Sequence, residues 1–432
     1  MDGSKAVLLL SPMSKAAFIT LGCKLNYAET SSLARQFAEQ GFEEVPPGPD
    51  VDIVVINTCS VTEHADKKCR NLIRRLHKQA PKAKIAVTGC YAQLKPQEIL
   101  AIDGVDLVVG ADRKGDLVRL ALTLEGGKQG YSCESNEVER FFPAYSSGER
   151  TRSFLKVQDG CDYHCAYCTV PLARGHSRNL PIADLVAQAR EIAAAGIVEV
   201  VLTGVNTGDF GKTTGESFLA LLQALNDVPG IERYRISSIE PNLLTEEILR
   251  WIASGTKFLP HFHIPIQSGC DRTLKAMHRR YTAAQFEEKI ALIRDILEKP
   301  EERCTRVFFG IDVIVGFPGE TEEDFEETYR LLERVRPAFL HIFPYSRRAG
   351  TPAAERSDQV QESVKTERVA RLEALSDRLH AAFTAANTGR PARVLFESTA
   401  KGGKMFGYTE NYLRVERPFD KEKIGKIVEV TL

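Results

Sequence analysis

The sequence lacks any long apolar run, any excess of one charge and any dense set of cysteines. None of its apolar stretches approaches the roughly 20 residues that a membrane-spanning helix needs. The apolar stretch at residues 6–10 is shorter than the roughly 7–15 residues of a signal-peptide core. The formal net charge of -1 excludes a global basic field, so any contact with RNA must come from local basic patches. We therefore expect a cytoplasmic protein that does not enter a membrane.

The composition is that of a globular protein in a reducing compartment. Ten cysteines among 432 residues are too few for a disulfide scaffold, and several stand at short spacings that fit metal binding. Hydrophobic residues make up 43% and charged residues 27% of the chain, which are ordinary values for a protein with a full core. The length allows two or three domains.

The most informative motif is the run GCDYHCAYC at residues 160–168. It places Cys161, Cys165 and Cys168 at the spacing C-x-x-x-C-x-x-C. Three thiolates can hold three corners of a four-iron cluster and leave the fourth iron open to another ligand. A zinc knuckle and a chance grouping are the alternatives. Structural zinc sites usually close to four ligands with paired spacings, and the spacing of His164 suits no common zinc pattern.

The first part of the chain repeats one pattern three times. Short apolar runs at residues 16–23, 52–59 and 84–90 end in Cys23, Cys59 and Cys90. Each run predicts a buried parallel strand. Helices are predicted at residues 29–40, 63–79 and 97–102, and a further strand at 106–109. The alternation indicates an α/β doubly wound domain over residues 1–125, in which ligands bind beyond the carboxyl ends of the strands. The three cysteines are predicted to meet at that edge.

A polar stretch at residues 126–150, rich in glycine and serine, predicts a linker. The segment that follows, residues 151–387, again alternates strands and helices, which indicates an open or closed parallel barrel. Its predicted strands are residues 199–203, 234–239, 262–266, 307–315 and 339–344, and its predicted helices are 182–195, 283–298, 322–335 and 358–387.

The last stretch, residues 388–432, alternates apolar and polar residues between glycines and predicts a small antiparallel β-barrel. From Gly389 onward it carries nine Lys/Arg against six Asp/Glu. Basic residues beside aromatic ones suit unstacked bases and phosphates, so we expect RNA contacts here and near both cysteine sets. The residues singled out are Arg70, Arg74, Arg75, Lys78, Arg174, Arg178, Arg393, Lys401, Lys404 and Arg414, with Phe406, Tyr408 and Tyr412.

Several motifs together resemble one protein family. The cysteine triplet and the residues after it, 169–178, resemble the cluster loop of radical S-adenosylmethionine (SAM) enzymes of the methylthiotransferase branch. The contexts of Cys23, Cys59 and Cys90 resemble that branch's N-terminal cluster domain, and residues 313–321 resemble its radical-domain signature. The C-terminal barrel looks like the family's RNA-binding TRAM domain. The resemblance spans nearly the whole chain, and it implies a central partial (β/α) barrel.

The resemblance implies two [4Fe-4S] clusters and SAM as cofactors. Cys161, Cys165 and Cys168 would hold the radical cluster, and Cys23, Cys59 and Cys90 would hold a second one that presents sulfur. No catalytic side chain is implied beyond the cluster ligands. The residues expected to contact SAM are Tyr167, Gly204, Asn206, Ser238, Glu240, Gln267, Arg280, Gly316 and Phe317.

The residues at 22–30, 61–66 and 157–162 look most like the branch that methylthiolates N6-threonylcarbamoyladenosine in the anticodon loop of tRNA. The alternatives are isopentenyladenosine in tRNA and an aspartate of ribosomal protein S12. A non-catalytic RNA-binding module with a structural metal is a further alternative, and it predicts closed four-ligand sites. We also expect an electron donor such as flavodoxin or ferredoxin, and a monomer.

Overall fold

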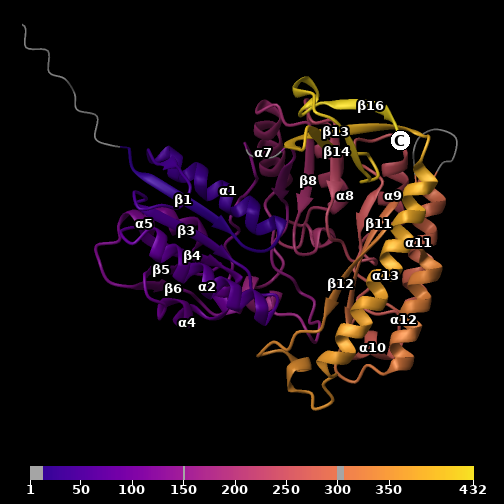
Figure 1. Ribbon diagram of the computed structural model, residues 1–432, viewed down its shortest axis with the longest axis horizontal. Coiled ribbons are helices and arrows are strands. Elements are labelled where there is room, and N and C mark those ends of the chain that lie inside the picture. Colours follow the sequence, from indigo (N-terminus) through magenta and orange to yellow (C-terminus); the bar gives the residue numbers. More distant parts are fainter. Residues whose placement is uncertain (1–12, 149–150, 299–305) are drawn as a thin grey trace, which may run out of the picture. The chain divides into compact units, whose positions relative to one another are not determined.

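The computed structural model describes residues 13–148, 151–298 and 306–432. The stretch 6–10 and Cys304 lie outside these ranges. The chain divides into two compact units, of which the first contains the described residues up to Ser60 and His64–Phe142, and the second contains Val61–Glu63 and Pro143–Leu432. Figure 1 colours both units along the sequence. Within the described ranges, no helix is both long and apolar enough to cross a membrane.

A parallel six-stranded sheet in the order β2-β1-β3-β4-β5-β6 forms the first unit. Every residue of β3 is buried, as expected for a central strand of a parallel sheet covered on both faces. The strands are β1 (Lys15–Thr20), β2 (Glu43–Glu44), β3 (Ile53–Thr58), β4 (Lys84–Gly89), β5 (Val105–Val109) and β6 (Gln129–Tyr131). β6 lies within the stretch predicted as a linker and adds the last strand to the sheet.

Helices connect these strands, and the first of them begins earlier than the sequence pattern predicts. α1 starts at Lys24 because Cys23 takes an extended conformation and forms its N-cap. α2 has the predicted bounds. The helices of this unit are α1 (Lys24–Glu39), α2 (Glu63–Gln79), α3 (Cys90–Leu94), α4 (Pro96–Leu100) and α5 (Leu117–Leu122), with short 3-10 turns η1 (Lys114–Asp116) and η2 (Ser135–Glu137).

Six parallel strands in chain order form the core of the second unit. They are β7 (Ser153–Lys156), β8 (Glu199–Thr203), β9 (Arg233–Ile236), β10 (His261–His263), β11 (Phe308–Val315) and β12 (Phe339–Pro344). The backbone N–H of Ile239 donates to the carbonyl of His263 at 3.1 Å and so connects the β7-β8-β9 part to the β10-β11-β12 part. This arrangement confirms the predicted α/β class and the partial barrel.

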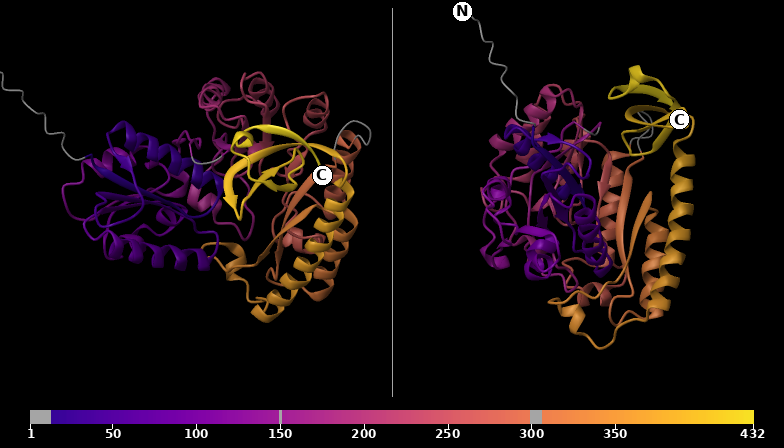
Figure 2. Two further views of the ribbon diagram at one scale, coloured as in Figure 1. Left: turned by 45° about the horizontal axis from the view of Figure 1, so that its top comes forward. Right: turned by 60° about the vertical axis from the view of Figure 1, so that its left-hand side comes forward.

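The helices of this unit cover the outer face of the strands. Figures 1 and 2 show α11, α12 and α13 along β11 and β12. The helices of the second unit are α6 (Val170–Arg174), α7 (Ile182–Ala194), α8 (Phe218–Asn226), α9 (Glu246–Ala253), α10 (Asp271–Ala276), α11 (Ala283–Leu297), α12 (Glu322–Val335) and α13 (Glu362–Asn387), with the 3-10 turns η3 (Thr207–Asp209) and η4 (Pro352–Glu355). Alternate residues such as Leu202, Ile236 and Ile311 pack against them in the apolar core.

A four-stranded antiparallel sheet in the order β15-β14-β13-β16 ends the chain. Its strands are β13 (Pro391–Lys401), β14 (Lys404–Tyr408), β15 (Arg414–Pro418) and β16 (Ile427–Thr431). The short 3-10 turn η5 (Lys421–Lys423) lies between β15 and β16. Arg235 donates to the carbonyls of Thr409 and Glu410 at 2.7 and 2.8 Å, and Arg233 donates to that of Arg393 at 3.0 Å. Two buried arginines therefore attach this sheet to β9.

Glu199 supplies the charge that lets both arginines be buried. Its carboxylate lies 2.8 Å from Arg235 Nε and 3.4 Å from Arg233 Nη1, and all three side chains are at most 1% exposed. Burial alone would raise the pKa of Glu199, but the nearby guanidinium groups of Arg235, Arg152 and Arg233 outweigh it and lower that pKa.

We therefore expect Glu199→Gln to destabilise the second unit by about 3–5 kcal/mol, because it leaves two buried cations without their counter-charge. Thermal unfolding followed by circular dichroism measures the effect. The matched control is Glu246→Gln, which removes an exposed pair with Arg250 whose contribution is about 0.5 kcal/mol or less. Equal melting temperatures for the two variants would contradict this role of Glu199.

Candidate active site

The cysteine loop of the second unit begins directly after β7 and runs into α6. Gly160 opens it with a positive φ of 72°. A Cβ at this position would lie 1.9 Å from the carbonyl oxygen of His176. The backbone N–H of Cys161 donates to the carbonyl of Gly175 at 3.0 Å, so the two ends of the loop are held together. Only glycine allows this close approach.

Each thiol of the triplet has a hydrogen-bond donor beside it. Cys161 Sγ accepts from the backbone of Tyr163 and Cys168 Sγ from that of Val170, both at 3.4 Å, while Cys165 Sγ accepts from Arg279 Nη1 at 3.1 Å. Burial raises the pKa of Cys161 and of Cys168 to about 12. A bound metal would deprotonate these thiols outright. The donor set therefore fits an iron–sulfur cluster with three thiolate ligands.

A buried ionic cluster fixes this loop from behind. Asp159 Oδ1 lies 2.9 Å from Arg174 Nη1, and its Oδ2 lies 2.6 Å from Lys156 Nζ and 3.4 Å from Arg178 Nη2. Burial alone would raise the pKa of Asp159, but these three cations hold it well below its usual range. The prediction that Arg174 and Arg178 contact RNA is wrong, because both side chains are buried and pair with Asp159.

Arg279 is the functional side chain that the sequence reasoning missed. It is 2% exposed, pairs with Glu240, and donates to Tyr281 Oη at 2.8 Å as well as to Cys165. Tyr281 in turn donates to the carbonyl of Pro265 at 2.6 Å. The predicted residue Arg280 instead lies with its guanidinium 3.8 Å from the ring centroid of Tyr163 and donates to the carbonyl of Asp162. The only sequence signal for Arg279 was its position next to Arg280, the arginine that was predicted to contact SAM.

The remaining residues predicted to contact SAM follow the carboxyl ends of strands in this unit. Gln158 Oε1 accepts from the backbone N–H of Asn206 at 3.0 Å, and a Cβ on Gly204 would lie 2.9 Å from the same oxygen. Asn206 Oδ1 accepts from the N–H of Glu240 at 3.2 Å. The carbonyl of Ser238 also accepts a hydrogen bond from the hydroxyl of Thr207. The bonds of Asn206 and Thr207 therefore connect the turn after β8 with the turn after β9.

Further along the barrel, Gln267 and Gly316 both have positive φ, at 69° and 71°. Gln267 bridges to Val313 next to the end of β11. Phe317 is fully buried and packs edge-on against Tyr345, with ring centroids 5.7 Å apart. Tyr167 is partly buried, and its hydroxyl lies 3.5 Å from Arg279 Nη1. The structure thus brings Tyr167 and Glu240 to Arg279 and places Gly316 and Phe317 beyond β11.

The first unit brings its three cysteines to one edge of its sheet. Cys23 caps α1, Cys59 follows β3, and Cys90 opens α3 directly after β4. A Cβ on Gly22, whose φ is 105°, would lie 2.7 Å from the Cβ of Cys59. Asn26 Nδ2 donates to the carbonyls of Leu21 and Thr58 at 2.9 and 3.0 Å. These bonds connect the first two cysteine turns, as the parallel pairing of β1 and β3 requires.

Cys69 lies next to this set without belonging to it. Its Sγ donates to the carbonyl of Cys59 at 3.4 Å, and burial raises its pKa to about 11. The thiol is therefore an inert packing group that supports the Cys59 turn.

A parallel partial barrel with a three-cysteine loop after its first strand defines the class of radical SAM proteins. The model of the radical SAM superfamily matches residues 155–332, and that of the uncharacterized protein family UPF0004 matches residues 15–110. The fold of the radical SAM methyltransferase TsrM from Kitasatospora setae is similar, with a TM-score of 0.56 at 14% identity over 79% of this chain and 74% of that one.

Curated relatives give the finer assignment. The threonylcarbamoyladenosine tRNA methylthiotransferase MtaB of Bacillus subtilis is 41% identical over 97% of this chain and 94% of the relative. MtaB of Aquifex aeolicus is 38% identical over 97% of this chain and 100% of the relative. The tRNA-2-methylthio-N(6)-dimethylallyladenosine synthase of Sphingopyxis alaskensis is 34% identical over 96% and 94%. The chain therefore belongs to the radical SAM methylthiotransferases, and its cofactors include SAM and an iron–sulfur cluster.

The close approach of Gly160 to His176 predicts that cluster assembly needs glycine at this position. The Gly160→Ala variant should bind much less iron in the cysteine loop and should no longer cleave SAM, because the added methyl group collides with the carbonyl of His176. Gly196→Ala is the matched control, since Gly196 has a φ of 79° and nothing within 4 Å of an added Cβ. Both variants share a backbone strain of about 1 kcal/mol. Iron content and deoxyadenosine release measure the difference, and equal losses would refute the steric argument.

Proposed function

We propose that this protein inserts a methylthio group at C2 of N6-threonylcarbamoyladenosine at position 37 in the anticodon loop of tRNA. The observation that carries the proposal is its identity of 36–41% to three relatives named for this activity. Three relatives named as dimethylallyladenosine synthases are 34–35% identical, so isopentenyladenosine in tRNA is the second candidate substrate. An aspartate of ribosomal protein S12 is the third.

In this proposal Cys161, Cys165 and Cys168 hold a [4Fe-4S] cluster. When bound, this cluster supplies the electron that cleaves SAM to the radical that removes hydrogen from the substrate. The side chains around it have a supporting role. Arg279 places a positive charge and a donor at Cys165, and Glu240 and Tyr281 hold that guanidinium in position. A fixed donor of this kind lowers the cost of the negative charge on the sulfur.

The proposed SAM contacts lie after four neighbouring strands. Gly204 and Asn206 follow β8, Ser238 and Glu240 follow β9, Gln267 follows β10, and Gly316 and Phe317 follow β11. Tyr167 and Arg280 complete the set from the cysteine loop and from the turn after α10. Ligands of parallel α/β proteins bind beyond the carboxyl ends of strands, which supports this placement.

Cys23, Cys59 and Cys90 are proposed to hold a second [4Fe-4S] cluster that supplies sulfur. Insertion of sulfur into a C–H bond needs a sulfur source that a radical does not provide. Their position at one strand edge and the close approach of Gly22 to Cys59 support a shared ligand. One SAM molecule would donate the methyl group and another would form the radical.

The first unit, which extends through β6 to Phe142 and so includes most of the stretch 126–150 predicted as a linker, is proposed to hold the second cluster. Residues 151–387 are proposed to carry the radical chemistry, and residues 388–432 to form a TRAM-like RNA-binding barrel. The exposed cations Lys401 and Arg414 support RNA binding by the last part. The half-buried Tyr412 already has both a ring and a cation beside it, because it stacks on Tyr408 with ring centroids 4.8 Å apart and lies under Arg235. We also propose a cytoplasmic monomer that receives electrons from flavodoxin or ferredoxin.

Separate roles for the two cysteine sets predict different defects. Cys161→Ala should abolish SAM cleavage, whereas Cys59→Ala should still release 5′-deoxyadenosine but form no methylthio product, because only the sulfur source is lost. Chromatography of the SAM products and mass spectrometry of tRNA nucleosides measure both. Cys133→Ala, which removes a cysteine outside either set, is the control. Identical failure of Cys161→Ala and Cys59→Ala in SAM cleavage would contradict the division.

The substrate is identified by incubating the reconstituted enzyme with tRNA that carries either threonylcarbamoyladenosine or isopentenyladenosine and measuring the methylthio product of each. A methylthio product from the first substrate alone is the expected result. A product from the second alone, or from S12 protein alone, would overturn the proposed substrate while leaving the family assignment in place.

Binding of tRNA should depend on single cations of the C-terminal sheet. Each of Lys401→Ala and Arg414→Ala should weaken binding to any tRNA and lower the slope of log affinity against log salt by about 1, because one phosphate contact is lost. Filter binding over a salt series provides the measurement. Arg330→Ala, on the exposed side of α12, is the control. Unchanged slopes for both variants would exclude this sheet from the tRNA interface.

A further inference from the structure

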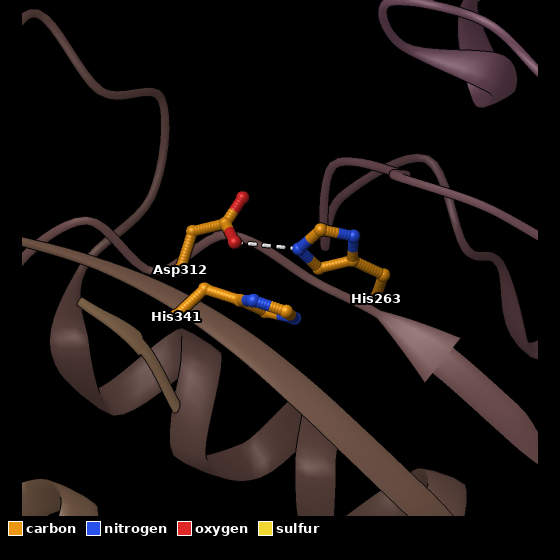
Figure 3. Close-up of side chains that lie close together, drawn as sticks. All are labelled: His263, Asp312 and His341. Atoms are coloured by element: carbon orange, nitrogen blue, oxygen red, sulfur yellow. Dashed lines mark hydrogen bonds and ion pairs between the residues drawn. The ribbon is translucent and has the colours of Figure 1, made fainter. Parts of the chain in front are cut away.

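Three polar side chains from neighbouring strands meet inside the barrel of the second unit. His263 ends β10, Asp312 lies in β11 and His341 in β12. Parallel pairing places Asp312 opposite His341, and His263 opposite Gly310, two residues before Asp312. Since alternate residues of a strand share a face, all three side chains project from the same face of the sheet. Figure 3 shows them converging on one point.

The opposite face of these strands is the apolar one. Phe262, Phe309, Ile311 and Leu340 are buried there in the core that the outer helices cover. The triad therefore occupies the inner face, which is not covered by those helices. The side chains of His263 and Asp312 are 23% and 18% exposed, so they are partly desolvated and still accessible.

The three side chains are close enough to share a single ion. One ligand atom from each, an imidazole nitrogen or a carboxylate oxygen, lies within 4.8 Å of the other two. His263 Nε2 lies 2.5 Å from Asp312 Oδ1, and the two imidazole rings have their centroids 4.8 Å apart. Gly310 leaves room beside His341, since a Cβ there would lie 3.5 Å from His341 Nε2. Phe339 packs edge-on against the ring of His341 and limits its orientations.

Charge also favours a cation at this point. Among the residues that the structure describes, Asp312 has an ion pair only with His263, which is neutral unless protonated. The arginines of the inner face, Arg233 and Arg235, are already paired with Glu199. Imidazoles bind metals in their uncharged form, so such a ligand set of two imidazoles and one carboxylate brings one negative charge to a divalent cation.

We propose that His263, Asp312 and His341 bind one divalent first-row transition-metal ion. Two histidines and one carboxylate on one side of an ion are a known set for such metals, and they leave positions open for water or another oxygen ligand. The site goes beyond the proposed function. Asp312 lies four residues before Gly316, which is about 13 Å along a strand. Its carbonyl accepts a hydrogen bond from the backbone N–H of Gln267 at 2.9 Å, so the site borders the proposed SAM contacts at that residue.

The test uses the full-length protein with its iron–sulfur clusters assembled under anaerobic conditions. Mn²⁺ is titrated, and the free ion is counted from its room-temperature EPR signal. Zn²⁺ is then measured by equilibrium dialysis and elemental analysis. We expect one site per chain for at least one of these ions, and a loss of about tenfold or more in affinity for Asp312→Asn and His341→Ala. Modulation of the bound Mn²⁺ signal by nitrogen would identify the imidazole ligands directly.

The controls separate loss of the site from loss of the fold. His64→Ala removes an exposed histidine from α2 and should leave metal binding unchanged. His341→Gln keeps a polar side chain of similar size, so it serves if the alanine variant does not fold, as judged by circular dichroism and cluster absorbance. If neither Mn²⁺ nor Zn²⁺ distinguishes the wild type from the His341 and Asp312 variants, the three side chains form only a hydrogen-bonded group and the proposal is overturned.

Discussion

The buried carboxylate of Asp159 is the interaction on which the geometry of the cysteine loop depends. It joins a strand residue, Lys156, to Arg174 and Arg178, which lie on the far side of the loop. All four side chains are buried, so these ion pairs are screened little by solvent and fix both ends of the loop relative to β7. Arg279 acts at the loop separately, by donating to Cys165 Sγ.

A second buried ionic group has a similar composition but a different use. Glu199 pairs with Arg233 and Arg235 at the amino-terminal end of the barrel strands, and these arginines donate to carbonyls of the C-terminal sheet. Carbonyl dipoles of that sheet therefore share in balancing the charge of the two guanidinium groups. The barrel thus has one charged group at each end, of which one fixes the cysteine loop and the other fixes the C-terminal sheet.

The sequence was sufficient to predict the features that depend on local order. The bounds of α2, α12 and β12 followed from apolar periodicity, and the strand-end cysteines followed from the alternation of strands and helices. It did not predict features that depend on tertiary pairing. Arg174 and Arg178 looked like a solvent-facing basic stretch because their partner, Asp159, stands 15 and 19 residues earlier in the sequence. Arg279 and the triad were missed for the same reason, since His263, Asp312 and His341 are distant in sequence and adjacent only through strand register.

The two kinds of metal ligand also differ in where the fold places them. The cysteines lie on turns beyond strand ends, where Gly22 and Gly160 have positive φ and allow the backbone to approach Cys59 and His176 closely. The histidines and Asp312 project from the strands themselves, where the sheet spacing sets the distance between neighbouring side chains at about 5 Å. A spacing of that size suits the ligands of one ion and is too small for a cluster in which each thiolate binds a different iron. Nitrogen and oxygen ligands also prefer harder metals than thiolates do. Position and chemistry therefore act together, so that the strand site would accept a single ion while the turn of Cys161, Cys165 and Cys168 suits an iron–sulfur cluster.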